Sequence, residues 1–261
     1  MRTHIYYVNA FTDKFFKGNP ATIVKLKKWL DDDLMQKIAA ENNLSETAFI
    51  APIEDQLHIR WFTPTTEVDL CGHATLAAAH ILFNHEDFEG DQVLFHSKSG
   101  ILKVYNNFEN LTLDFPADSI QEVKKIPELI KLDAQHVVQE MYKGKTDLMF
   151  VLNKQQEIEE YLPNIALIRQ LNYRGLIITA PGESADFVSR FFGPKTGINE
   201  DPVTGSAHTT LTPFWANRLK KNKLTAAQLS KRGGNLTCEL KGNRVFIGGT
   251  CLTYFKGELF I

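Results

Sequence analysis

The sequence has few cysteines and no long apolar stretch. Its three cysteines, Cys71, Cys238 and Cys251, are an odd number without CxxC spacing, which argues against a disulfide framework and a structural zinc site. No apolar run reaches the roughly 18 residues that a membrane-spanning helix needs, and the N-terminus lacks a basic region followed by an apolar core. We therefore expect a cytoplasmic protein with no membrane partner and no metal.

The sequence also lacks a large excess of positive or negative charge. The chain carries 29 basic and 31 acidic side chains, for a net charge of −2. This balance lacks the basic footprint that nucleic-acid binding needs, so we expect no nucleic-acid partner. At 261 residues, the chain is long enough for one large domain or two ordinary ones with a sizeable core.

A repeat relates the two halves of the chain. Ala51-Pro52 recurs as Ala180-Pro181, an offset of 129 residues, and the offset grows to 133 at the end of the repeat. The other matches are Arg60 with Arg190, Phe62 with Phe192, Pro64 with Pro194, Thr66 with Thr196, Glu67 with Glu200, Gly72 with Gly205 and Ala74 with Ala207. A duplicated pattern usually means a duplicated structural unit. We therefore predict an N-terminal half, 1–117, and a C-terminal half, 118–261, with the terminal strand free to cross between them.

Short alternating apolar runs predict strands, and some of their turns predict hairpins. Leu57, Ile59 and Trp61 alternate with polar residues, as a half-buried strand does. Gly242-Asn243 and Lys256-Gly257 separate further runs near the C-terminus, which favours two hairpins there. Helices are fewer, with acidic residues 31–33 and Asn164 as candidate N-caps.

The segment 74–83 is apolar nearly all round, so a helix there must be buried on every side. A curved sheet wrapped around it is the simplest arrangement. Its partner would follow Gly205-Ser206 and contain Leu211, Phe214 and Trp215. The fold class predicted is thus α+β, with two pseudo-symmetric halves, each a curved, mixed, barrel-like sheet around a central buried helix.

Each of these helices is entered through a glycine and a polar residue, Gly72-His73 and Gly205-Ser206. Unpaired N–H groups and the helix dipole favour a carboxylate or enolate oxygen at such a terminus. We predict a small-molecule substrate in a cleft between the two halves. The other polar residues at these points are Asp201, Thr204 and His208.

Glu46 lies in the segment 43–50, where it places a carboxylate in an otherwise apolar strand. Burying an acid is costly unless it is paired or functional. Burial also disfavours the charged form, which suits a residue that must accept and release a proton near neutral pH. Its counterpart at the 129-residue offset is Gly175, which we interpret as leaving room for substrate. The alternative is a strand-end glutamate that reaches solvent.

Cys71 and His73 together suggest a thiolate mechanism, but residues two apart do not share a helix face, so a small buried thiol is the favoured interpretation. His73, His80 and His208 with Cys71 show no recognised metal-ligand spacing. We therefore predict no metal and no cofactor. His73 as a satisfied buried imidazole and Ser206 as a plain N-cap remain alternatives.

Motifs along the whole chain resemble the phenazine-biosynthesis PhzF-like family, which is similar in fold to diaminopimelate epimerase. They are Ala10-Phe11-Thr12, Gly18-Asn19-Pro20-Ala21, Leu44-Ser45-Glu46-Thr47-Ala48-Phe49, Arg60-Trp61-Phe62-Thr63-Pro64, Asp69-Leu70-Cys71-Gly72-His73-Ala74-Thr75, Arg190-Phe191-Phe192-Gly193-Pro194, Glu200-Asp201-Pro202-Val203-Thr204-Gly205-Ser206-Ala207-His208, Gln228 and Arg232-Gly233-Gly234. The resemblance implies a homodimer and proton transfer without metal or cofactor.

The resemblance also implies roles for single residues. Glu46, His73 and Asp201 correspond to catalytic positions, and Gly72, Gly205 and Ser206 to substrate binding. Epimerase relatives use two opposed cysteines, where this chain has Cys71 and Thr204, so a two-cysteine racemisation is not expected. Asn9 also departs from the family, because many relatives have aspartate there.

We therefore expect an isomerase in which Glu46 shifts a proton on a small carboxylate-bearing metabolite. A dihydro-hydroxyanthranilate-like compound of phenazine biosynthesis and an amino or hydroxy acid both remain open as substrates. A non-catalytic small-molecule binding protein on the same scaffold is an alternative, and a Cys71-dependent hydrolase is a weaker one.

Overall fold

The computed structural model describes residues 2–107, 110–124, 132 and 138–261. The chain forms two compact units, unit 1 from Met1–Phe115 with Ile247–Ile261, and unit 2 from Pro116–Phe246. The predicted halves, 1–117 and 118–261, differ from these units mainly in the C-terminal segment. That segment lies in unit 1 because the last strand pairs antiparallel with the first, from Arg2 opposite Phe260 to Ala10 opposite Cys251.

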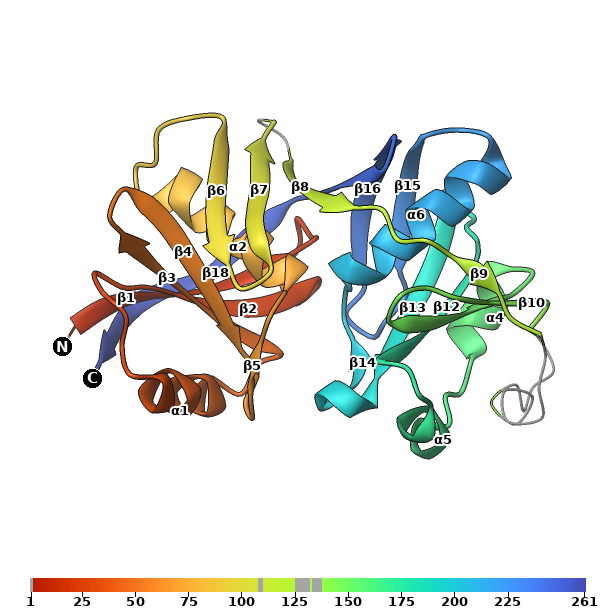
Figure 1. The fold of residues 1–261 in the computed structure, drawn as a ribbon, viewed down its shortest axis with the longest axis horizontal. Coiled ribbons are helices and arrows are strands. Elements are labelled where there is room, and N and C mark those ends of the chain that lie inside the picture. The colour runs from red at the N-terminus through yellow and green to blue at the C-terminus, as the bar shows by residue number, and fades with distance from the viewer. Residues whose placement is uncertain (1, 108–109, 125–131, 133–137) are drawn as a thin grey trace. The chain divides into compact units, whose positions relative to one another are not determined.

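Unit 1 contains a mixed sheet and two helices (Figure 1). Its strands are β1 (Arg2–Ala10), β2 (Asn19–Lys25), β3 (Glu46–Ile53), β4 (Gln56–Phe62), β5 (Glu67–Val68), β6 (Gln92–Ser97), β7 (Gly100–Asn106), β8 (Leu111–Pro116, whose last residue belongs to unit 2) and β18 (Cys251–Phe260). Its helices are α1 (Asp32–Asn42) and α2 (Gly72–His85). Helix α1 packs on β3 and β4 around Phe49 and Phe62.

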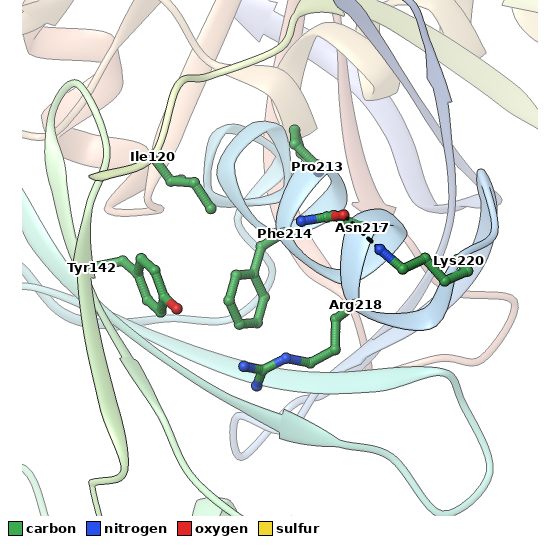
Figure 2. A pocket seen from close by; sticks show the side chains of 7 residues that line it. All are labelled: Ile120, Tyr142, Pro213, Phe214, Asn217, Arg218 and Lys220. Atoms are coloured by element: carbon green, nitrogen blue, oxygen red, sulfur yellow. Dashed lines mark hydrogen bonds between the residues drawn. The ribbon is translucent and has the colours of Figure 1, made fainter. Parts of the chain in front are cut away.

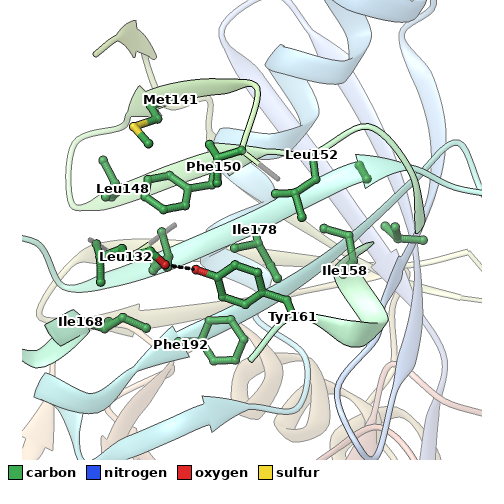
Figure 3. Packing of buried hydrophobic residues seen from close by; sticks show 14 residues of the cluster. Leu132, Met141, Leu148, Phe150, Leu152, Ile158, Tyr161, Ile168, Ile178 and Phe192 are labelled. Carbon is green, nitrogen blue, oxygen red and sulfur yellow. Dashed lines mark hydrogen bonds between the residues drawn. The ribbon is translucent and has the colours of Figure 1, made fainter. Parts of the chain in front are cut away.

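Unit 2 also contains a mixed sheet, with more short helices. Its strands are β9 (Gln121–Glu122), β10 (Glu140–Lys143), β11 (Asp147–Val151), β12 (Gly175–Pro181), β13 (Phe187–Gly193), β14 (Ile198–Asp201), β15 (Lys223–Gln228) and β16 (Gly234–Lys241), and β17 (Arg244–Gly249) passes into unit 1. The helices in the described residues of unit 2 are α4 (Gln155–Glu160), α5 (Ile165–Gln170), α6 (Gly205–Leu219) and the 3₁₀ turn η1 (Pro194–Thr196). Figure 3 shows its core, where the Tyr161 hydroxyl donates to the Leu132 carbonyl at 3.0 Å.

The strands of the two units belong to one continuous hydrogen-bonded sheet and repeat one pairing pattern. In unit 1, β2 pairs parallel with β3, β3 antiparallel with β4, β4 parallel with β6, and β6 antiparallel with β7. Unit 2 has the same series: β11 pairs parallel with β12, β12 antiparallel with β13, β13 parallel with β15, and β15 antiparallel with β16. The predicted duplication and the α+β fold class are confirmed.

The repeated Arg and Glu residues explain part of that duplication physically. Arg60 Nε donates to Glu67 at 2.7 Å, and Arg190 Nε donates to Glu200 at 2.7 Å. Both pairs are bidentate, and each guanidinium lies over a phenylalanine ring of its own strand. A planar guanidinium suits such a two-point contact better than an ammonium does. The same ion pair thus ties β4 to β5 and β13 to β14.

The two predicted central helices are present, and each begins at its matched glycine, two residues before the start predicted after Gly72-His73 and Gly205-Ser206. In α2, all residues from Gly72 to Ala79 are buried, and the helix contacts β1, β2, β3, β7 and β18. Helix α6 contacts β15 and β16 and contains Pro213 without ending there. Within the described ranges, no helix is long and apolar enough to cross a membrane.

Two of the local predictions are confirmed and one is wrong. The Asn164 side chain caps α5 by accepting from the Leu167 N–H at 3.1 Å, and Gly242 turns between β16 and β17 with φ +58°. Lys256-Gly257 forms no hairpin. The pair lies inside β18, opposite Tyr6 and Ile5, because pairing along the whole of β1 outweighs the local turn signal.

Gly18 should be irreplaceable for packing as well as for backbone conformation. Its φ is +69°, and an added Cβ would lie 2.3 Å from the Ala10 carbonyl oxygen. We expect Gly18→Ala to lower the free energy of unfolding by more than the about 1–3 kcal/mol of backbone strain alone. Gly242→Ala is the matched control, since its φ is +58° and nothing lies within 4 Å of its added Cβ. Urea unfolding of both variants measures the difference, and equal losses would contradict the packing argument.

Buried histidines should make stability fall in acid. Burial lowers the pKa of His80 and of His208 to about 4 in each case. The unfolded chain therefore binds more protons below the ordinary histidine pKa, so stability is complete above about pH 6.5 and falls toward pH 4, by at most about 1.4 kcal/mol per pH unit for each histidine. Chemical unfolding at several pH values should show a shallower fall for His80→Gln. A slope equal to that of the parent protein would contradict the assignment.

Candidate active site

Glu46 is the first residue of β3, and its partner across the parallel pair is Ala21 of β2. Its side chain is 13% exposed, and its Oε2 lies 3.3 Å from Nε2 of His73. The glutamate at the start of an apolar strand therefore points toward an imidazole, as its unusual position in the sequence suggested. The two predicted catalytic residues of unit 1 are neighbours.

His73 is in the first turn of α2 and is 4% exposed. Burial lowers the pKa of its imidazole to about 3, against a smaller opposing effect of a hydrogen bond with the Pro20 backbone. The ring is therefore neutral near pH 7, and its 3.3 Å contact with Glu46 is not an ion pair. The amide nitrogen of Asn19 lies 3.1 Å from Nδ1. With Asn19 donating to Nδ1, the ring proton is on Nε2, the nitrogen nearest Glu46.

Cys71 immediately precedes α2, and its Sγ lies 3.5 Å from Nδ1 of His73. The turn before α2 brings the two side chains together, because Cys71 has an extended backbone and His73 is already helical. Cys71 is also buried, as the favoured interpretation of a small buried thiol expected. Among the described parts of the chain, Glu46, Cys71 and His73 form a group of possible metal ligands whose ligand atoms all lie within 4.8 Å of one another.

In unit 2, Asp201 ends β14 just before α6 and takes part in a buried polar network. Its Oδ2 accepts from the Thr204 hydroxyl at 2.5 Å. Gln228 accepts from the Thr204 N–H at 2.8 Å and donates to the Asp201 carbonyl at 2.8 Å. The network fixes the chain at the entrance to α6, so Asp201 is held in place by Thr204 and Gln228.

Ser206 follows Gly205 in the first turn of α6, and its Oγ accepts from Arg174 at 2.9 Å. Arg174 also donates through Nε to Asp147 at 2.9 Å, and Asp147 is 2% exposed. The sequence reasoning missed Arg174 and Asp147. The available signal was a carboxylate that opens an apolar strand, the same signal that drew attention to Glu46.

Two other expectations are corrected. Gly175, the counterpart of Glu46, does not leave room for substrate, because an added Cβ would lie 2.5 Å from Cζ of the Phe191 ring. His208 is fully buried in the core of unit 2, where its Nδ1 donates to the Thr204 carbonyl at 2.8 Å and its ring is tilted against Phe187. Its position next to the predicted site in the sequence does not make it solvent-accessible.

A separate hollow of about 410 Å³ lies beside α6. Figure 2 shows Phe214 between Tyr142 and Arg218 in this hollow. Arg218 is held by both carboxylate oxygens of Glu140, at 2.6 and 2.7 Å, and Tyr142 donates to the same carboxylate. None of the predicted site residues lines it. The hollow is therefore not the candidate active site.

Comparisons with known proteins identify the family. Residues 8–257 match the model of the phenazine biosynthesis-like (PhzC-PhzF) family. A protein of Pseudomonas aeruginosa named as an uncharacterized isomerase is 48% identical over 99% of both chains. Another protein named in the same way, from Halalkalibacterium halodurans, is 45% identical over 100% of both chains.

Solved structures agree. A PhzF-family protein of Enterococcus faecalis has a TM-score of 0.96 at 46% identity, with both chains covered completely. A predicted epimerase of Pseudomonas aeruginosa has a TM-score of 0.74 at 16% identity over 99% of both chains, which shows a shared epimerase-like fold. The motifs, the duplicated topology and these matches lead to one conclusion: the chain belongs to the phenazine biosynthesis-like protein family.

Proposed function

We propose that this chain is an isomerase in which Glu46 transfers a proton between carbon atoms of a small carboxylate-bearing metabolite, without a cofactor. The observation that carries the proposal is the 3.3 Å contact between the Glu46 carboxylate and a buried, neutral His73 at the start of α2. The curated relatives named as isomerases support the reaction class.

The neutral state of His73 matters for the chemistry. An imidazolium beside Glu46 would stabilise the carboxylate and make it a weaker base. A neutral imidazole contributes only an N–H dipole, so it can orient the carboxylate and leave its basicity largely intact. Asn19, at 3.1 Å from Nδ1, holds the ring in the orientation that turns Nε2 toward Glu46.

The proposed reaction is a proton shift without oxidation or reduction. A substrate C–H bond breaks as its proton forms an O–H bond on Glu46, and the electron pair moves into the substrate as an enolate or extended π system. The proton then returns from Glu46 to a different carbon, which regenerates the carboxylate. One residue suffices as base and then as acid, which agrees with the absence of a second cysteine at Thr204.

A carboxylate on the substrate is proposed because of the helix termini. The first N–H groups of an α-helix lack intrahelical partners and carry part of the positive end of the dipole. Helices α2 and α6 both begin at glycine, Gly72 and Gly205, a residue that has no side chain of its own. We propose these two glycines, with Ser206 and Asp201, as substrate-binding and assisting groups.

A homodimer in the cytoplasm is part of the same proposal.

Glu46→Gln should abolish proton exchange and leave the fold intact. Gln is close to Glu in shape and cannot accept the proton, so we expect at least about a 100-fold loss. Mass spectrometry of solvent deuterium incorporated into a panel of cyclic and linear amino and hydroxy acids measures the rate. Glu41→Gln, an exposed change on α1, is the control and should keep the rate of the parent protein. Exchange that survives in Glu46→Gln would contradict the proposal.

His73→Gln should lower kcat without changing the shape of the pH profile. Burial lowers the pKa of His73 to about 3, so this residue does not ionise between about pH 5 and pH 8. Profiles of kcat and kcat/KM for the parent protein and the variant should therefore be parallel. If the variant lost a limb of the profile in this range, His73 would be titrating and the neutral-imidazole account would be wrong.

A further inference from the structure

Three different ligand types meet in unit 1. Glu46 offers a carboxylate oxygen, Cys71 a sulfur and His73 a ring nitrogen, and these atoms all lie within 4.8 Å of one another. The shortest contacts are 3.3 Å between Glu46 and Nε2 of His73, and 3.5 Å between Cys71 and Nδ1.

The ligand set matches the preferences of zinc. Zn²⁺ binds thiolate, imidazole and carboxylate groups at about 2.0–2.3 Å in tetrahedral sites. Those bond lengths place neighbouring ligand atoms about 3.3–3.6 Å apart. The contact between Glu46 and Nε2 of His73 already has this spacing, and the sulfur of Cys71 lies within the 4.8 Å that the group spans, so side-chain rotation is needed to bring it to the metal. Three protein ligands leave the fourth position open, as in zinc sites that bind water or substrate.

A second observation concerns His73 itself. It is 4% exposed, and within the described ranges its Nε2 has no well-directed hydrogen-bond partner. Nδ1, in contrast, is already in contact with Asn19 and Cys71. A metal-binding histidine usually has its other ring nitrogen held by an amide, carbonyl or carboxylate. Nε2 is therefore the nitrogen left for a metal, and Asn19 is its supporting residue.

We propose that Glu46, Cys71 and His73 form a binding site for one zinc-class divalent cation, which inhibits the protein by occupying Glu46. On binding, the Cys71 S–H bond breaks, a sulfur–metal bond forms and the proton leaves to solvent. At His73 the metal takes Nε2, the ring keeps one proton on Nδ1, and a half-turn of the Asn19 amide presents Oδ1 to it. No electron is transferred. The inhibition rests on the proposed function, whereas the binding does not.

The test uses cobalt as a spectroscopic substitute for zinc. Purified, chelator-treated full-length protein is titrated with Co²⁺, and we expect one equivalent to produce a near-ultraviolet thiolate-to-cobalt charge-transfer band with visible bands typical of four-coordinate Co²⁺. Zn²⁺ should remove these bands, and a chelator should reverse the effect. Absence of the charge-transfer band in the parent protein would overturn the proposal.

Variants identify the ligands. Cys71→Ala should lose the charge-transfer band, and Glu46→Gln and His73→Gln should weaken binding. Asn19→Ala should reduce the affinity by about 10- to 100-fold, as loss of a supporting residue does. Cys251→Ser is the matched control in unit 1 and should keep the band, and far-ultraviolet circular dichroism checks the fold of each variant. A band that survives in folded Cys71→Ala, or that disappears in Cys251→Ser, would refute the assignment.

Zinc inhibition of deuterium exchange separates the two proposals. If exchange depends on Glu46 and Zn²⁺ stops it with the affinity measured by displacement of Co²⁺, both proposals hold. If cobalt binds through Cys71 but no exchange is found, the proposed function fails while the metal site stands. If exchange is unaffected at zinc concentrations that saturate the site, the inhibition is refuted.

Discussion

The contact between a carboxylate and an uncharged imidazole at the start of a buried helix is the constraint on which the site depends. Burying Glu46 and His73 together in water-poor surroundings is costly unless each has a partner. The structure places their side chains 3.3 Å apart, and Asn19 contacts Nδ1 on the far side of the ring. Because burial lowers the pKa of His73 to about 3, the imidazole adds no positive charge beside Glu46. A neutral imidazole suits Glu46 as a base, because a positively charged imidazolium would stabilise the carboxylate and weaken its basicity.

The duplicated scaffold supports different chemistry in its two units. Both central helices begin at a glycine, and the strands of both units repeat the same order with the same arginine–glutamate pair. The difference lies where β3 begins with Glu46 and β12 begins with Gly175. The Phe191 ring occupies the space beside Gly175, so unit 2 has an apolar ring at the place where unit 1 has its acid. The two units therefore share their strand pairing and central helix but differ at the first residue of the strand that carries Glu46 in unit 1.

The central helices and the duplicated strand pairing could be predicted well because the sequence signals for them are local. Glycines before apolar helices and repeated arginine and glutamate residues can be recognised along the chain, so the central helices and the duplication were confirmed, with each helix beginning two residues earlier than predicted. The proximity of Glu46 and Cys71 to the His73 ring depends on the pairing of β3 with β2 and on a bend before α2, which no spacing rule contains. The space beside Gly175 was misjudged for the same reason, since Phe191 belongs to the next strand.

The protonation state of His73 is the quantity that most directly tests this account. Nitrogen-15 NMR of histidine-labelled protein distinguishes neutral imidazole from imidazolium and shows which ring nitrogen carries the proton. We predict a neutral His73 ring with its proton on Nε2 throughout the range from about pH 8 to about pH 5. An imidazolium signal for His73 near pH 6 would mean that Glu46 is part of an ion pair, and the proposed role of Glu46 as a free base would have to be abandoned.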